Sequence, residues 1–291
     1  MTGCQSTCPP PDLRALTGYL LRRAFVRAAS AARECIPTGE HVREIAIMAI
    51  LAERGAVSQR ELADVTHVNR SLIVKLVDDL EARGWVVRDR NPEDRRSYAL
   101  RLTPQAHAVL AERHQDLDRG EAQLMEPLTP DERQRFKDHL TVLLTGDEAV
   151  TVTMMADRAG YLIAHAHRLL RSWAEAGSAP LDLHPRDFGV LAALGRQEPC
   201  SQNQLAASLG VTPPAVLAFV DELEQKGLVA RSRNRDDRRA YDVTLTSQGR
   251  ARLRAAQAVA RGIQQRVEAR LGAESDSELR GLLIKLLHGD V

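Results

Sequence analysis

The chain contains an internal repeat, and this repeat constrains its fold more than any other feature. Ser58-Gln59 returns as Ser201-Gln202, and Leu102-Thr103 returns as Leu245-Thr246, with no gap in the register between them. The copies stand about 143 positions apart, whereas solenoid repeats have periods of roughly 20 to 50 residues. The period has the length of a whole domain. The sequence therefore predicts two fused copies of one domain, at 12–146 and 147–291, behind a flexible leader at 1–11.

The composition is that of a globular protein with two cores. Of 291 residues, 44% are hydrophobic and 27% are charged, which suits two domains of about 100 to 150 residues each. Aromatic residues make up only 3%, which argues against a stacking platform for single-stranded nucleic acid. The first residues lack the basic and apolar stretches of a secretory signal, and no apolar run reaches the ~18 residues that span a bilayer. We expect a cytoplasmic protein without a membrane partner.

Cysteine and motif patterns narrow the class further. Cys4 and Cys8 lie in a Pro-rich leader, while Cys35 and Cys200 stand alone. This pattern predicts neither a disulfide framework nor a paired-cysteine zinc site. The sequence has no nucleophile elbow, phosphate loop or HExxH signature. We therefore expect no enzymatic activity, no cofactor and no resident metal.

Each copy has the same predicted order of elements. Long packing helices at 13–33 and 152–176 precede apolar helices at 41–54 and 185–196. Capping boxes that begin at Ser58 and Ser201 start a short helix, and a tight turn leads to a second helix at 69–83 or 212–226. Two strands follow in each copy, at 85–88 and 98–102 and at 228–231 and 241–245, with a charged loop between them. Thr103 and Thr246 then cap further helices, and the copies finish with helices at 130–144 and 276–287.

This order predicts a mainly α fold with small β wings. It comprises two winged helix-turn-helix domains. Net charge is only +1, but basic residues gather at two equivalent places, the loops between the paired strands. Concentrated basic charge beside a helix-turn-helix favours a duplex nucleic-acid partner.

The stretches Leu80 to Thr103 and Leu223 to Thr246 resemble the MarR family of bacterial transcription regulators. Each carries a leucine, a glycine, a strand, Asp-Arg-Arg, a tyrosine and Leu-Thr in the same order. The resemblance implies that the two domains pair through their terminal helices, which form a helical pairing region with pseudo-two-fold symmetry. It also implies that each domain presents a recognition helix to a major groove and a wing to a minor groove. It also implies an effector, often aromatic or phenolic, that modulates operator affinity. We expect repression, since occluding a promoter requires only binding.

The short connection between the copies suggests that the two partners of such a pair have become one chain. The sequence then predicts an intramolecular pseudo-dimer on one duplex operator of roughly 20 base pairs. A homodimer of tandem chains with four reading heads remains the alternative.

The candidate DNA-binding residues fall into reading helices and wings. Polar positions at the helix starts can reach base edges or phosphates; they are Asn69, Arg70, Ser71 and Lys75 in the first copy and Thr212 and Pro213 in the second. The wing arginines are Arg88, Arg90, Arg95 and Arg96, and then Arg231, Arg233, Arg235, Arg238 and Arg239. By the resemblance, Arg96 and Arg239 enter a minor groove while Asp94 and Asp237 hold the loop. Because the second helix lacks basic residues near its start, we expect an asymmetric, pseudo-palindromic operator that is read mainly by the first copy.

The sequence does not identify the effector, and metal-sensing and thiol-sensing alternatives remain open. The candidate ligand-binding residues are Tyr19, His41, Arg43 and Trp85 in the first copy and His165, Arg168, Trp173, His184 and Asp187 in the second. Glu40, His41, His107 and His114 form a weaker metal-sensing hypothesis, because HxxxH spacing is absent. Cys35 is a candidate redox-sensing thiol, although only Arg33 lies near it in sequence to lower its pKa. The apolar start of the second reading helix leaves open a protein-interaction role for that copy.

Overall fold

The computed structural model describes residues 11–66, 68–90, 98–146, 155–209, 211–233 and 241–288. These residues are mainly helical and include two small antiparallel sheets, which confirms the predicted fold class. Packing divides the chain into two units: unit 1 comprises 1–168 and 267–291, and unit 2 comprises 169–266. These borders differ from the repeat boundary at 146/147, because the last helix of the second copy packs on helices of the first copy.

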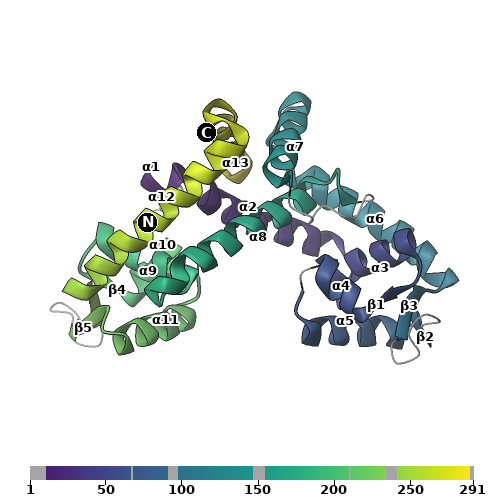
Figure 1. Ribbon diagram of the computed structural model, residues 1–291, viewed down its shortest axis with the longest axis horizontal. Helices are drawn as coiled ribbons and strands as arrows, with labels where there is room; N and C mark the ends of the chain where they lie inside the picture. The colour runs from purple at the N-terminus through teal and green to yellow at the C-terminus, as the bar shows by residue number, and fades with distance from the viewer. Residues whose placement is uncertain are drawn as a thin grey trace, which may run out of the picture. The chain divides into compact units, whose positions relative to one another are not determined.

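Unit 1 contains the first copy and the end of the second. Its elements are α1 (Pro11–Arg14), α2 (Thr17–Cys35), α3 (Val42–Arg54), β1 (Val57–Ser58), α4 (Gln59–Thr66), α5 (Arg70–Ala82), β2 (Val86–Arg90), β3 (Tyr98–Leu102), α6 (Pro104–Leu124), α7 (Pro130–Leu144), the first part of α8 (Ala159–Ser178) and α13 (Ala273–His288) (Figure 1). The sheet order is β1-β3-β2, with Val57 opposite Leu100 and Val86 opposite Leu102. α4 and α5 form a helix-turn-helix, and β2 with β3 forms its wing.

Unit 2 repeats this arrangement with the second copy. Its elements are the rest of α8, the 3₁₀ turn η2 (Ala179–Leu181), α9 (Pro185–Arg196), β4 (Cys200–Ser201), α10 (Gln202–Leu209), α11 (Pro213–Gln225), β5 (Val229–Arg233), β6 (Tyr241–Leu245) and most of α12 (Ser247–Leu271). The sheet order β4-β6-β5 matches that of unit 1, with Cys200 opposite Val243 and Val229 opposite Leu245.

The helix starts follow the capping signals in the sequence. The backbone N–H of Ser58 donates to the Glu61 carboxylate at 2.8 Å, and the N–H of Glu61 donates to the Ser58 hydroxyl at 3.1 Å. Ser201 and Gln204 form the same reciprocal pair at 2.8 and 3.3 Å. Each hydrogen bond satisfies an amide that has no partner within its own helix. The predicted starts of α4 and α10 are therefore confirmed.

Two features of the elements differ from the sequence expectations. Within the described residues the long first helices begin later than predicted, at Thr17 in the first copy and Ala159 in the second. The third strand of each sheet, β1 or β4, was not predicted, because it has only two residues and carries no alternation to recognise. Each of these strands pairs with the returning strand of the wing and so ties the start of the helix-turn-helix to the sheet.

Each copy has its own apolar core beneath its helix-turn-helix. In the first copy, Ile45, Met48, Leu62, Val77 and Leu80 are among its buried members. The corresponding cluster of the second copy includes Val190, Leu205, Val216, Val220 and Leu223. Burial of such side chains contributes about 1.5 to 3 kcal/mol each. The reading helices α5 and α11 are therefore anchored by one face, which leaves the opposite face available to a partner.

No single described helix is both long enough and apolar enough to cross a bilayer; only the bent pair α10 and α11, counted together, meets that test.

Candidate nucleic-acid interface

The outward face of α5 carries two exposed cations near its start. Arg70, Ser71 and Lys75 are exposed, whereas Ile73 and Leu76 on the opposite face are buried. Asn69 precedes the helix, and its side-chain oxygen accepts a hydrogen bond from the backbone N–H of Leu72 at 2.8 Å. Asn69 is thus the N-cap, and Arg70, Ser71 and Lys75 are the candidates that point to solvent.

The outward face of α11 has a different character. Thr212 precedes the helix, but its side chain makes no capping hydrogen bond. Pro213 and Pro214 form the exposed first turn, and Leu217 is 46% exposed. The helix contains no lysine, arginine or histidine. Its surface can offer apolar contact and backbone shape, but it offers no cation to a phosphate or a guanine.

One arginine in each copy fastens the wing to the reading helix. Arg88 of β2 forms ion pairs with Asp78 and Glu81 of α5. In the second copy Arg231 of β5 pairs with Asp221 of α11, and its Nη1 lies 2.8 Å from the carboxylate of Glu224. The two arginine side chains are only 27% and 18% exposed. Arg88 and Arg231, predicted as DNA contacts, are therefore engaged within the protein, where they join the wing to the reading helix.

The ends of the wing strands remain exposed, and the wing loops lie outside the described residues. Arg90 and Arg233 stand exposed at the last positions of β2 and β5. The predicted loop residues are not among those that the structure describes; they are Asp94, Arg95, Arg96, Arg235, Asp237, Arg238 and Arg239.

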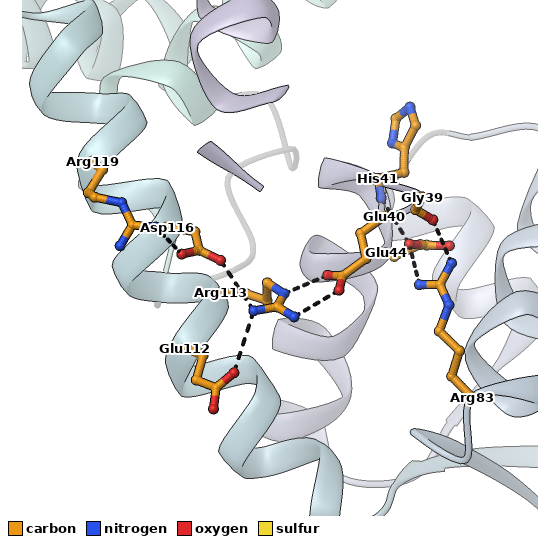
Figure 2. Close-up of polar contacts among 9 residues, drawn as sticks. All are labelled: Gly39, Glu40, His41, Glu44, Arg83, Glu112, Arg113, Asp116 and Arg119. Carbon is orange, nitrogen blue, oxygen red and sulfur yellow. Dashed lines mark hydrogen bonds and ion pairs between the residues drawn. The ribbon is translucent and has the colours of Figure 1, made fainter. Parts of the chain in front are cut away.

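A second fastening joins the end of each reading helix to the start of the preceding core helix. Figure 2 shows Arg83, which follows α5, with its Nη1 3.0 Å from the Glu44 carboxylate and its Nη2 donating to the carbonyl of Gly39 at 2.7 Å. Glu44 is 3% exposed and also accepts a hydrogen bond from the backbone N–H of His41. A buried carboxylate is stable only when it is paired and hydrogen-bonded, so Glu44 fixes the position of Arg83.

The second copy builds the same fastening with different side chains. Lys226 donates to the carbonyl of Asp182 at 3.0 Å and lies 3.9 Å from the carboxylate of Asp187, which is fully buried. Asp187 accepts a hydrogen bond from the backbone N–H of His184 at 2.9 Å. The sequence reasoning missed Arg83, Glu44 and Lys226. Their signal was available, because a cation and an acid recur at equivalent positions of the two copies.

These contacts give several predicted ligand residues a structural role. His41 and His184 are N-caps of α3 and α9, and their ring Nδ1 atoms accept hydrogen bonds from the backbone N–H groups of Arg43 and Arg186. Burial, followed by the nearby Arg43 charge, lowers the pKa of His41 below its usual value. A neutral ring is what this cap requires, because the accepting nitrogen must be unprotonated.

A buried ion cluster is found in the first copy beside the same loop (Figure 2). Arg113 of α6 pairs with Glu40 through Nε at 2.6 Å and Nη2 at 2.8 Å, and its Nη1 lies 3.2 Å from Asp116. The side chains of Arg113, Glu40 and Asp116 are 13%, 11% and 11% exposed. The hydrogen bond to Glu40 is the main reason that the pKa of Arg113 is raised. Arg119 also binds Asp116, at 2.6 Å.

The second copy has apolar residues where the first has this cluster. The positions equivalent to Glu40, Arg113 and Asp116 hold Leu183, Ala256 and Val259. Leu183 and Ala256 are buried in the core of unit 2. The two copies thus share their wing and helix fastenings but join the reading head to its long helix by different chemistry.

The remaining predicted ligand residues also contact protein groups. The guanidinium of Arg83 lies 5.1 Å from the ring centre of Trp85, and that of Arg266 lies 4.0 Å from the ring centre of Trp173. In unit 1, His165 contacts the ring of Tyr161 and lies 2.8 Å from Arg168. The same unit contains Tyr19, which is half-buried on α2.

The sensor alternatives find little geometric support. Among the described residues, no group of three or more histidine, cysteine or carboxylate side chains lies close enough to hold a metal ion. The hypothesis that joined Glu40, His41, His107 and His114 is therefore wrong for this structure, since Glu40 binds Arg113 and His41 caps α3. Cys35 is half-buried, and its thiol lies 3.9 Å from the side-chain oxygen of Gln123.

Known proteins resemble this chain over each of its two copies. Residues 42–98 match one family model and residues 181–240 match another, and both models are described as MarR family. The HTH-type transcriptional repressor Rv2887 of Mycobacterium tuberculosis is 37% identical over 127 residues, which cover 44% of this chain and 91% of that protein. The putative transcriptional regulatory protein for the hcr operon of Thauera aromatica is 36% identical over 118 residues, which cover 40% of this chain and 71% of that protein.

A solved structure of a probable transcriptional regulator from Pseudomonas aeruginosa shares 32% identity at a TM-score of 0.43, over 45% of this chain and 98% of that one. These two relatives match 91% and 71% of their own length to less than half of this chain, as expected when one chain holds two copies of their domain. Because Rv2887 is 37% identical and matched over 91% of its length, the chain belongs to the MarR family, with a family match in each of its copies.

Proposed function

We propose that this protein is a sequence-specific regulator of transcription, and a repressor, that binds duplex DNA with its two helix-turn-helix copies. The observation that carries the proposal is the outward face of α5, where Arg70 and Lys75 are exposed on a helix anchored by its opposite face. A helix held in this way can enter a major groove without losing its packing. The names of the relatives, an HTH-type repressor among them, support the same assignment.

The two heads have unequal roles in this proposal. Arg70 is suited to a guanine edge and Lys75 to a phosphate, whereas α11 can contribute only apolar and shape contacts. The operator is then asymmetric, and the first copy supplies most of its base specificity. The second copy contributes mainly through its wing, where Arg238 and Arg239 approach the phosphates and the minor groove.

Arg88 and Arg231 act as positioning residues in this scheme. Each joins a wing strand to two carboxylates of the reading helix. Wing and helix then approach DNA as one piece, so less orientational freedom is lost on binding. Arg90 and Arg233, exposed at the ends of β2 and β5, are better placed to touch phosphates.

The proposal takes one chain as the complete binding unit. The support is that α13, from the second copy, packs on α2 and α7 of the first. Domains of this family type pair through such terminal helices, so the pairing surface of each copy is occupied within the chain. Solution mass and footprint length, measured on the same complex, test this. A one-chain particle that protects roughly 20 base pairs is expected, and a two-chain particle over about 40 base pairs would refute it.

Selection of duplexes from a random pool, followed by titration of the winning sequence, tests the DNA-binding function. Arg70→Ala should weaken the selected complex by roughly 1 to 3 kcal/mol. Arg60→Ala is the matched control, because Arg60 lies 78% exposed on the neighbouring helix α4 and is not proposed to read bases. Failure to select any duplex would refute the function. If the second copy captured a protein while contributing nothing to DNA affinity, it would have to be assigned as an interaction module.

We also propose that a small aromatic or phenolic effector modulates the affinity. The fastening of His41, Glu44 and Arg83 joins the end of the reading helix to the start of α3, so a ligand that engages this loop would shift α5. Titration of the operator complex with a panel of aromatic acids and phenols tests the idea. An active compound should lose its effect in Arg43→Ala, whose side chain lies beside this loop, while basal DNA affinity is retained. A panel that leaves the midpoint unchanged would argue against the effector.

A further inference from the structure

The contact between α7 and α13, both in unit 1, joins the last helices of the two copies. Arg135 Nε lies 2.7 Å from Glu278 Oε1, and the two residues are 143 positions apart, which is the repeat itself. They are therefore equivalent residues that touch each other. In a two-fold arrangement, a residue can meet its own equivalent only beside the axis.

A symmetric pair of identical chains would place identical side chains at this point. Two copies of the first domain would bring Arg135 against Arg135, and two copies of the second would bring Glu278 against Glu278. Like charges held together in this way are unfavourable. The mixed pair places a cation against an anion, and His139 adds a second contact to Glu278 at 2.9 Å. These contacts hold the pKa of Glu278 below its usual value, with the hydrogen bond from His139 as the largest cause and that from Arg135 next.

A buried contact between α2 and α13 selects the same pairing. The hydroxyl of Thr17 donates to Asp276 Oδ1 at 2.6 Å, and both residues are fully buried. In this helix Thr17-Gly-Tyr-Leu corresponds to Ala159-Gly-Tyr-Leu, so the residue equivalent to Thr17 is Ala159, which has no hydroxyl. A pair of two second domains would therefore deprive Asp276 Oδ1 of this donor, although Arg280 would remain 3.0 Å from Oδ2. Loss of a hydrogen-bond donor to a buried acceptor is costly.

A pair of two first domains is also unfavourable. The residue equivalent to Asp276 is Arg133, whose Nε donates to the carbonyls of Met125 and Leu128 at 3.0 and 2.9 Å. In a pair of two first domains, Thr17 would face this arginine, which is already committed to its own loop. The Lys285 contact with Glu132, at 3.2 Å, is also lost in either pair of like domains, because the equivalent residues are Val142 and Ser275.

We infer that the contact faces of the terminal helices, on α2 and α7 in the first copy and on α13 in the second, are complementary to each other and not to themselves. Each copy therefore selects the other copy as its partner and rejects a second version of itself. The inference deepens the proposed function, since it rests on the one-chain pairing but not on DNA binding. The duplication has allowed the two halves to diverge across the axis, which two identical chains cannot do. The consequence is that chains of this protein do not exchange partners with one another through these faces.

Cross-linking tests the pairing directly in full-length protein. In a chain whose four native cysteines are replaced by serine or alanine, Arg135→Cys with Glu278→Cys should be joined by a short bismaleimide within one chain. Arg135→Cys alone should give no two-chain product, because its neighbour across the axis belongs to the same chain and carries no thiol. Arg60→Cys, exposed on α4, measures random collisions. A two-chain product from Arg135→Cys above that background would overturn the inference.

Charge reversal tests the complementarity. Glu278→Arg or Arg135→Glu should each lower the folding equilibrium constant of unit 1 by about two- to tenfold, since both side chains are partly exposed and such pairs are weak. The double reversal should recover the parent value to within about twofold. A double variant no better than the single variants would show that the contact does not select the pairing. Both measurements are made without DNA, so a failure of the DNA-binding function would leave their outcomes unaffected.

Discussion

Replacement of Arg113 tests the role of the buried ion cluster in the first copy. Its guanidinium pairs with three carboxylates, of which those of Glu40 and Asp116 are each only 11% exposed and that of Glu112 is 69% exposed. Removal of one partner of a buried pair typically costs 3 to 5 kcal/mol, because a charge is left buried without compensation. Arg119 still binds Asp116, and water can enter the space of a deleted arginine. We therefore expect Arg113→Ala to destabilise unit 1 by roughly 2 to 4 kcal/mol.

The second copy provides the matched control. The triple variant Glu40→Leu, Arg113→Ala, Asp116→Val installs the residues that the second copy has at the equivalent positions. Because no charge is then left unpaired in the core, it should lie within about 1 kcal/mol of the parent, despite three changes instead of one. The expected order of stability thus places the triple variant above the single variant.

Urea unfolding followed by Trp85 fluorescence measures this order. The chain has two tryptophans, Trp85 in unit 1 and Trp173 in unit 2, so a Trp173→Phe background reports on unit 1 alone. Comparison of midpoints is justified only while the slopes of the transitions agree. The cluster does not have this role if Arg113→Ala is within about 1 kcal/mol of the parent in stability, or if the triple variant is less stable than the single variant.

Three further predictions concern the reading heads and the pH dependence. Arg70→Ala should weaken specific DNA binding by roughly 1 to 3 kcal/mol, more than Thr212→Ala, and titrations in the reverse order would move the dominant head to the second copy. Arg238→Ala should reduce the slope of log affinity against log salt by about one, whereas an unchanged slope would contradict its phosphate contact. Burial, followed by the Arg158 charge, lowers the pKa of His114 from its usual 6.5, so the unfolded chain binds the proton more readily. The corresponding stability is complete above pH 6.5 and is lost as the pH falls below it; unfolding from pH 7.5 to 5.5 should show the loss, and His114→Gln should reduce it.

Local signals explain why so much of the fold was predictable. Ser58 with Glu61 and Ser201 with Gln204 mark helix starts through hydrogen bonds made within four residues of chain. Gly84 and Gly227 follow the reading helices with φ angles of 71° and 69°, a conformation that glycine adopts without strain. Such features depend on neighbours in sequence, so they can be recognised without a structure. The strand β1 could not, because two residues form a strand only when a distant partner is in place.

The candidate site was only partly predictable for the same reason. Arg70 and Lys75 could be assigned because helical periodicity alone separates an outward face from a buried one. Arg88 was predicted to contact DNA because it is a cation in a basic stretch of the sequence. That this cation faces Asp78 and Glu81 depends on how the hairpin folds back on the helix.

The amino-acid sequence was sufficient to predict two copies, most of their helix starts and the difference between their reading helices. These properties follow from periodicity, capping residues and composition, which act over a few residues. Which charges neutralise one another could be seen only in the folded chain, where Arg113 pairs with Glu40 and Arg135 pairs with Glu278. Those pairs join residues 73 and 143 positions apart. The energy of each of these charges depends on its burial and on the distance to the nearest opposite charge. Neither is defined until the helices pack against one another.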